Sequence, residues 1–246
     1  MNFLFRRKFP ETAEALIDGE IVAVTVKVSD RARSYRLSLP HAGDPVLTVP
    51  TYGRWPEAAA FLDRQVPWLA ARLKTQERPV AFTAGAIVPL RGIDHVIRAT
   101  GRVRGQVEIG ETASGGRALF VPGDPEHRAR RLTDWFRAEA QRDLGGRIRV
   151  HARRLGVETG TVRLRSQATR WGSCSANGNL SFNWRLVLAP PFVLDYVAAH
   201  EVSHLVRMDH SRAFWKTVER TLPDMERGRD WLKVNGRQLM IYGYDG

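Results

Sequence analysis

The strongest constraint on the fold is a five-residue pattern inside a helical stretch. His200, Glu201 and His204 stand in the sequence His-Glu-Val-Ser-His. Apolar residues repeat around it with helical spacing from 193 to 206, and Pro190-Pro191 suits the start of a helix. Residues i and i+4 of a helix differ by about 40° around the axis and about 6 Å along it. We therefore expect a helix that presents both imidazoles to one metal ion.

The residue types in this pattern indicate metal-assisted hydrolysis. Two imidazoles on one helix face can share a zinc ion at about 2.0–2.1 Å, while Glu201 is turned aside and can act as a general base toward water. A third histidine, His210, follows the expected helix end near Arg207. A chain reversal there would bring His210 to the site as the favoured third ligand. Three protein ligands leave an open position, which favours catalysis over a structural metal.

Two other residues are candidates for a chemical role. Glu219 lies on the next helical pattern and is a rival to His210 as third ligand, although a solvated charge on a helix is the interpretation we favour. Cys174 is the single cysteine, which excludes an internal disulfide framework and an all-cysteine metal site. We expect Cys174 to be a packing residue rather than a nucleophile.

The N-terminal half reads as mainly β-structure. Short apolar runs between Glu20 and Val49 predict a small antiparallel sheet, and residues 56–76 predict a helix with a kink or a break at Pro67. A second β-rich stretch covers 87–121. Pro122-Gly123-Asp124-Pro125 is the best candidate for a boundary. We therefore expect an α+β protein with a β-rich region at 1–122 and a metal-binding core at 123–246.

The core is expected to have a helix–β-hairpin–helix order. A long basic helix would extend to about Arg154 with an interruption at Gly145-Gly146. Residues 161–165 and 180–188 alternate in polarity and predict a hairpin, with an Asn-Gly turn signal within 175–178. The 180–188 strand would lead into the metal-binding helix and form the edge of a cleft.

Charge raises the question of a nucleic-acid partner. The formal net charge is +12, and residues 128–170 hold twelve arginines against four acidic residues, a net charge of +8. Such a segment could bind nucleic acid without sequence preference, although a solvated basic helix surface is the interpretation we favour. No apolar run approaches the ~20 residues of a membrane span, so we expect no membrane partner. Residues 1–8 have the wrong charge order for a secretory signal, and the protein is expected to be cytoplasmic.

Several motifs together resemble one known family. They comprise the stretches 170–175 (Arg-Trp-Gly-Ser-Cys-Ser), 183–186 (Asn-Trp-Arg-Leu), 195–197 (Asp-Tyr-Val), 200–205 (His-Glu-Val-Ser-His-Leu), 210–211 (His-Ser) and 214–215 (Phe-Trp), and more weakly 31–39 and 68–69. This combination is similar to the YgjP-like metallopeptidases, small gluzincins related to the SprT-like proteases. The histidine spacing equals that of the metzincins too, but Arg207 stands where they carry glycine.

The resemblance implies a zincin-like core, zinc ligands at His200, His204 and His210, and a catalytic Glu201. The expected reaction is hydrolysis of peptide bonds in a protein or peptide substrate, with Glu201 moving a proton from water to the leaving amine. Substrate or oxyanion contacts are expected from a further set of polar residues, namely Arg170, Asn183 and Tyr196. Two alternatives stay open: a zinc hydrolase of a nucleotide or other phosphate substrate, and a DNA-associated protease of the SprT-like kind.

Overall fold

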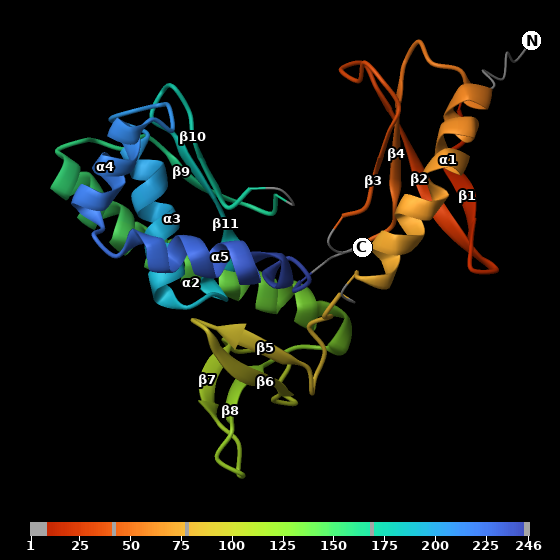
Figure 1. Cartoon of the computed structure of the whole chain (residues 1–246). Helices are drawn as coiled ribbons and strands as arrows, with labels where there is room; N and C mark the ends of the chain where they lie inside the picture. The colour runs from red at the N-terminus through yellow and green to blue at the C-terminus, as the bar shows by residue number, and fades with distance from the viewer. Residues whose placement is uncertain (1–8, 41–42, 77–78, 168–169, 244–246) are drawn as a thin grey trace, which may run out of the picture. The chain divides into compact units, whose positions relative to one another are not determined.

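The computed structural model describes residues 9–40, 43–76, 79–167 and 170–243. The N-terminal segment 1–8, considered above as an export signal, lies outside these residues. Contacts divide the chain into two compact units, residues 1–79 and 80–245. Within the described residues, no helix combines the length and apolar character that crossing a bilayer requires. The elements are labelled in Figure 1.

The first unit is a four-stranded sheet with one helix packed on it. Its elements are β1 (Thr12–Ile17), β2 (Glu20–Ser29), β3 (Arg36–Ser38), β4 (Val46–Pro50) and α1 (Trp55–Lys74). The strand order is β1-β2-β4-β3, and β2 pairs with β4 in parallel, so the prediction of a purely antiparallel sheet is wrong. The chain makes β3 between these strands, which gives it the length to return in the same direction. The helix α1 continues through Pro67, so the break that the sequence allowed there does not occur.

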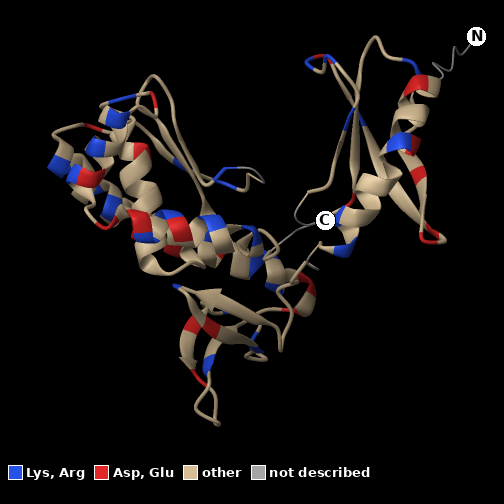
Figure 2. Ribbon diagram, in the orientation of Figure 1, with Lys and Arg blue, Asp and Glu red and all other residues tan. Residues whose placement is uncertain are grey.

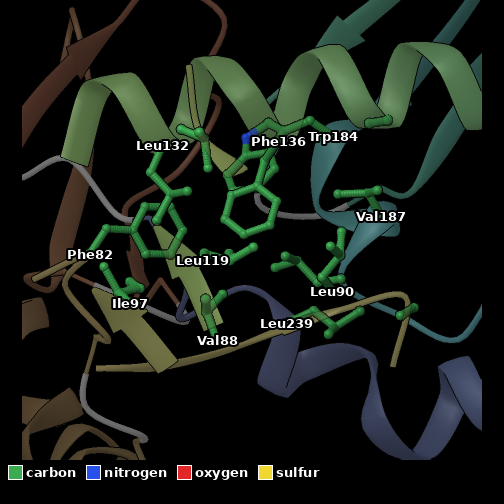
Figure 3. Close-up of a cluster of buried hydrophobic side chains, with 14 of the residues drawn as sticks. Phe82, Val88, Leu90, Ile97, Leu119, Leu132, Phe136, Trp184, Val187 and Leu239 are labelled. Carbon is green, nitrogen blue, oxygen red and sulfur yellow. The ribbon is translucent and has the colours of Figure 1, made fainter. Parts of the chain in front are cut away.

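The second unit begins with another four-stranded sheet. Its strands are β5 (Ile87–Leu90), β6 (Ile93–Ala99), β7 (Glu108–Glu111) and β8 (Arg117–Val121), in the order β5-β6-β8-β7. Helix α2 (Pro125–Leu155) packs on this sheet through Leu132 and Phe136, which share one core with Trp184 (Figure 3). The boundary between the two compact units therefore lies before Val80, whereas the sequence predicted a domain boundary after Pro122.

Helix α2 forms the base of the metal-binding core. It continues through Gly145 and Gly146, where the sequence had predicted an interruption. Leu144 and Ile148 flank the glycines and are both buried, so packing offsets the low helix propensity of glycine. The helix ends at Gly156, whose φ of 67° lies in the left-handed region typical of this position.

A three-stranded sheet follows α2 in the chain. Its strands are β9 (Val162–Arg165), β10 (Gly172–Cys174) and β11 (Leu180–Asn183), in the order β10-β11-β9, followed by the 3₁₀-helix η1 (Trp184–Val187). The hairpin predicted between 161–165 and 180–188 is wrong, because β9 and β11 are parallel. The turn after Ser175 instead joins β10 to β11, as a short turn can link only adjacent antiparallel strands.

Three helices complete the fold: α3 (Pro191–Ser203), α4 (Arg212–Thr221) and α5 (Met225–Leu239). Ser211 caps α4 by accepting a hydrogen bond from the Phe214 amide. Helices α3 and α5 approach closely at Gly228, where a β-carbon would lie 3.0 Å from the Phe192 carbonyl oxygen. The protein is thus α+β, as expected, with a β-rich N-terminal portion.

Candidate metal centre and active site

Three histidines converge where α3 ends and α4 begins. His200 lies in the last turn of α3, His204 directly follows that helix, and His210 precedes α4. Their ligand nitrogens all lie within 4.8 Å of one another, and the Nε2 atoms of His200 and His210 are 3.2 Å apart. Two nitrogens bound tetrahedrally to zinc lie about 3.3 Å apart. The donor set therefore fits a zinc ion in both type and spacing.

The rings of His204 and His200 are oriented by different means. The Nδ1 of His204 lies 3.0 Å from the Arg207 carbonyl oxygen, to which it can donate, and this leaves Nε2 free as a ligand. The Nδ1 of His200 is buried and has no hydrogen-bond partner among the described residues. Packing holds this ring instead, since Trp215 and Tyr196 lie 5.6 and 6.0 Å from it between ring centroids.

Phe214 forms an apolar base beneath all three imidazoles. Its ring centroid lies 5.0 Å from His200, 4.5 Å from His204 and 5.0 Å from His210. The side chain of Phe214 is fully buried. A rigid aromatic ring at this position limits rotation of each histidine, so Phe214 belongs to the site as well as to the core.

The surroundings keep two of the imidazoles neutral. Burial lowers the pKa of His200 to about 4, with further contributions from His204 and His210. Burial also lowers the pKa of His204, and the nearby His210 acts in the same direction. A neutral imidazole has a free lone pair, which is the form that binds a metal cation.

Glu201 lies against strand β10. The side chain is buried, and an ideal β-carbon at Gly172 would fall 2.5 Å from its Oε1 and 2.8 Å from its Cδ. Only glycine at position 172 leaves the carboxyl this space. Burial raises the pKa of Glu201 to about 7. A carboxyl with a pKa near the working pH can both take up and release a proton, as a general base requires.

A cavity of about 210 Å³ opens beside the carboxyl. It is smaller than the pockets that hold drug-sized ligands, so it suits a single side chain. Its lining comes from the start of β10 and from α3: Arg170, Trp171, Gly172, Tyr196, Val197, His200 and Glu201. Burial raises the pKa of Tyr196 to about 12, so its phenol remains a hydrogen-bond donor at neutral pH.

The residues predicted to contact substrate divide into two groups. Arg170 and Tyr196 both line the cavity. Asn183 is not part of this lining. Its Oδ1 accepts from the Arg185 amide at 3.1 Å, and its Nδ2 donates to the Gln167 carbonyl at 2.8 Å. Asn183 is buried and caps η1.

Two further sequence candidates lie outside the histidine cluster. Glu219 is an exposed residue of α4, and the three histidines form the only potential metal-binding group among the described residues. Cys174 is half-buried, and burial together with the nearby Glu201 raises the pKa of its thiol. A raised pKa disfavours the reactive thiolate, which agrees with a packing role.

The cleft edge is β10 rather than the strand predicted at 180–188, because β11 is the central strand of its sheet. Trp171 and Ser175 exchange main-chain hydrogen bonds with the β11 side of the hairpin. Alternation along a strand then turns the main-chain groups of Gly172 and Cys174 toward the open edge. The sequence did not reveal this role for 172–174, since a three-residue strand with a glycine carries little β signal.

Comparison with known proteins places this geometry in a family. A crystal structure of the metallopeptidase zymogen of Pyrococcus abyssi abylysin is 20% identical and covers 37% of this chain and 93% of that one. Its TM-score of 0.35 is too low to carry an argument. A search of curated proteins finds no match. The model of the YgjP-like metallopeptidase domain matches residues 33–235, a span that includes all three histidines, Glu201 and strand β10. Since that match covers most of the sequence, the chain belongs to the YgjP-like family of metallopeptidases.

Proposed function

We propose that the protein is a zinc-dependent peptidase of the His-Glu-x-x-His type. His200, His204 and His210 hold the metal, and Glu201 is the general base. One observation carries the proposal: three ligand nitrogens converge within 4.8 Å beside a buried carboxyl whose pKa is about 7. The family supports metallopeptidase activity in general, and the donor set supports zinc in particular.

Zinc bound at these histidines would supply a Lewis acid that polarises the peptide carbonyl and makes water acidic. Glu201 accepts the proton of the attacking water on its carboxylate and delivers it to the leaving amine. Tyr196, which keeps its proton, and the guanidinium of Arg170 line the adjoining cavity and are the proposed donors to the developing oxyanion.

The open edge of β10 is the proposed binding surface for an extended peptide. Main-chain groups of Gly172 and Cys174 would pair with the substrate backbone, and the 210 Å³ cavity would receive one substrate side chain next to the scissile bond. Binding through the backbone fixes the position of the peptide without restricting most of its sequence.

Removal and return of the metal tests the proposal. Treatment of purified protein with a chelator should abolish the release of new amino termini from an unfolded protein substrate, and one equivalent of zinc should restore it. Phosphate release from nucleotides, measured in parallel, decides the main alternative. Metal-dependent phosphate release without new amino termini would replace the peptidase proposal by a phosphohydrolase.

A further inference from the structure

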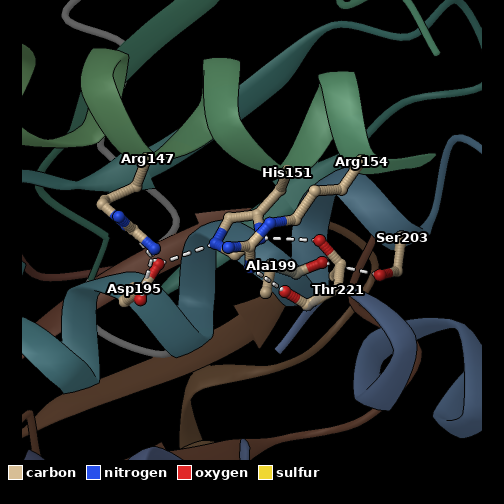
Figure 4. A network of polar contacts seen from close by, with 7 residues as sticks. All are labelled: Arg147, His151, Arg154, Asp195, Ala199, Ser203 and Thr221. Atoms are coloured by element: carbon tan, nitrogen blue, oxygen red, sulfur yellow. Dashed lines mark hydrogen bonds and ion pairs between the residues drawn. The ribbon is translucent and has the colours of Figure 1, made fainter. Parts of the chain in front are cut away.

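A buried hydrogen-bond network connects the two elements that carry the three histidines (Figure 4). His151 of α2 has no exposed surface. Its Nε2 lies 2.7 Å from Oδ1 of Asp195 on α3, and its Nδ1 lies 2.8 Å from Oγ1 of Thr221 at the end of α4. One imidazole thus joins the helix of His200 and His204 to the helix that follows His210.

Two arginines of α2 fix the outer ends of this network. Arg147 makes a bidentate pair with Asp195, with Nη2 2.7 Å from Oδ2. Arg154 donates to the main-chain carbonyl of Thr221 at 2.6 Å. Burial opposes ionisation of Asp195, but the hydrogen bonds from His151 and Arg147 outweigh it and lower its pKa. An ionised carboxylate only accepts, so Nε2 of His151 carries a hydrogen whichever form the ring takes.

These residues do not touch the reacting atoms. His151 and Thr221 are both inaccessible to solvent, so the Asp–His–Thr arrangement cannot act as a nucleophile with its base. Their effect on the site is through the relative positions of the helices. Helix α4 is ten residues long, about 15 Å at 1.5 Å per residue, with His210 just before one end and Thr221 at the other.

Apolar packing alone would not fix the angle between α3 and α4. Their contact is built from buried side chains such as Phe214, Val218 and Val202, whose attraction is not directional. The bonds of His151 are directional, and they are shielded from water. We propose, on the basis of the proposed metal site, that His151 with Asp195 and Thr221 positions the third ligand, His210, relative to His200 and His204.

The substitution Thr221→Val tests this inference. Valine keeps the shape of threonine and removes only the hydroxyl that His151 contacts. We expect zinc affinity to fall by about 10-fold or more, and the visible spectrum of the cobalt-substituted protein at saturation to change, because both depend on ligand geometry. Thr221→Ser retains the hydroxyl and should restore both properties.

The chain offers a matched control in Thr217→Val. Thr217 is one turn earlier on α4 and is also buried, and among the described residues its hydroxyl donates within its own helix, to the Ala213 carbonyl at 3.0 Å. Its replacement should leave zinc affinity and the cobalt spectrum unchanged. Equal effects from the two valine variants, or no effect from Thr221→Val, would overturn the positioning role.

A double-mutant cycle separates positioning from general destabilisation. If Thr221 acts through His210, then Thr221→Val should not weaken zinc binding further once His210 is alanine. A loss of the same size in both backgrounds would contradict the inference. The proposed function has a separate test, because it is wrong if the wild-type protein binds no zinc. If wild type binds zinc and Thr221→Val binds it equally well, only the positioning role is wrong.

Discussion

At the scale of single residues, Gly172 shapes the surroundings of the Glu201 carboxyl by lacking a side chain. A methyl group there would overlap Glu201, so the buried carboxyl would have to shift from its present position. We expect Gly172→Ala to lower peptide hydrolysis by more than 10-fold, since small displacements of a general base are costly, while zinc binding is retained. Measured kcat and zinc stoichiometry check this. Gly146→Ala, where a β-carbon meets nothing within 4 Å, is the matched control and should be fully active.

The third ligand is the second prediction at this scale. His210→Ala should weaken zinc binding and hydrolysis together, because it removes one of three converging nitrogens. Glu219→Ala should change neither, because Glu219 is an exposed residue outside the cluster. Dissociation constants from chelator competition decide the question. The opposite ranking of the two variants would transfer the third-ligand role to Glu219.

At the scale of elements, the ionised Asp195 links α2 to α3. Its lowered pKa means that its stabilisation is complete above the unfolded pKa of about 3.9 and is lost as pH falls through the folded value. Asp195→Asn should therefore lower the free energy of unfolding by about 1–3 kcal/mol at pH 7, with a difference that shrinks below about pH 4. Urea unfolding across this pH range measures it. Asp230→Asn, at an exposed carboxylate, is the control and should leave the free energy of unfolding at pH 7 nearly unchanged.

Elements also differ in how far the sequence predicted them. The histidine spacing and the Ser211 cap define α3 and α4 locally, because helix geometry and capping act within a few residues. Strand partners and the continuity of α1 and α2 depend on contacts distant in sequence. Burial of Leu144 and Ile148 stabilises α2 across its two glycines. The apolar pattern of 180–188 predicted one long strand, but β11 ends at Asn183, where the side chain caps η1 instead.

At the scale of the whole molecule, several arginines of the Arg-rich segment 128–170 already have partners within the protein. Arg147 pairs with Asp195 and Arg142 with Glu139, while Arg131 and Arg154 donate to main-chain carbonyls. Figure 2 shows Lys and Arg interspersed with acidic residues along α4 and α5. Nucleic-acid binding by residues 128–170 stays a prediction, for which a steep decrease of affinity with salt is the expected signature.

The division into two units predicts which fragment folds alone. A fragment of residues 80–246 keeps the sheet β5–β8 against α2, so it should fold cooperatively and bind zinc. A fragment of residues 123–246, which starts at the boundary predicted from sequence, would expose Leu132, Phe136 and Trp184. We expect it to aggregate or to unfold without a cooperative transition. Circular dichroism and zinc titration of both fragments test this, and a stable 123–246 fragment would support the sequence-based boundary instead.

The most direct test of the account is the paired measurement of zinc content and peptide hydrolysis in Glu201→Gln. Glutamine preserves the shape of the side chain beside Gly172 but cannot accept the proton of water, whereas the three histidines are unchanged. The account predicts about one zinc per chain, as in wild type, with new amino termini reduced by at least 10²-fold. Wild-type hydrolysis by a zinc-replete Glu201→Gln protein would contradict it.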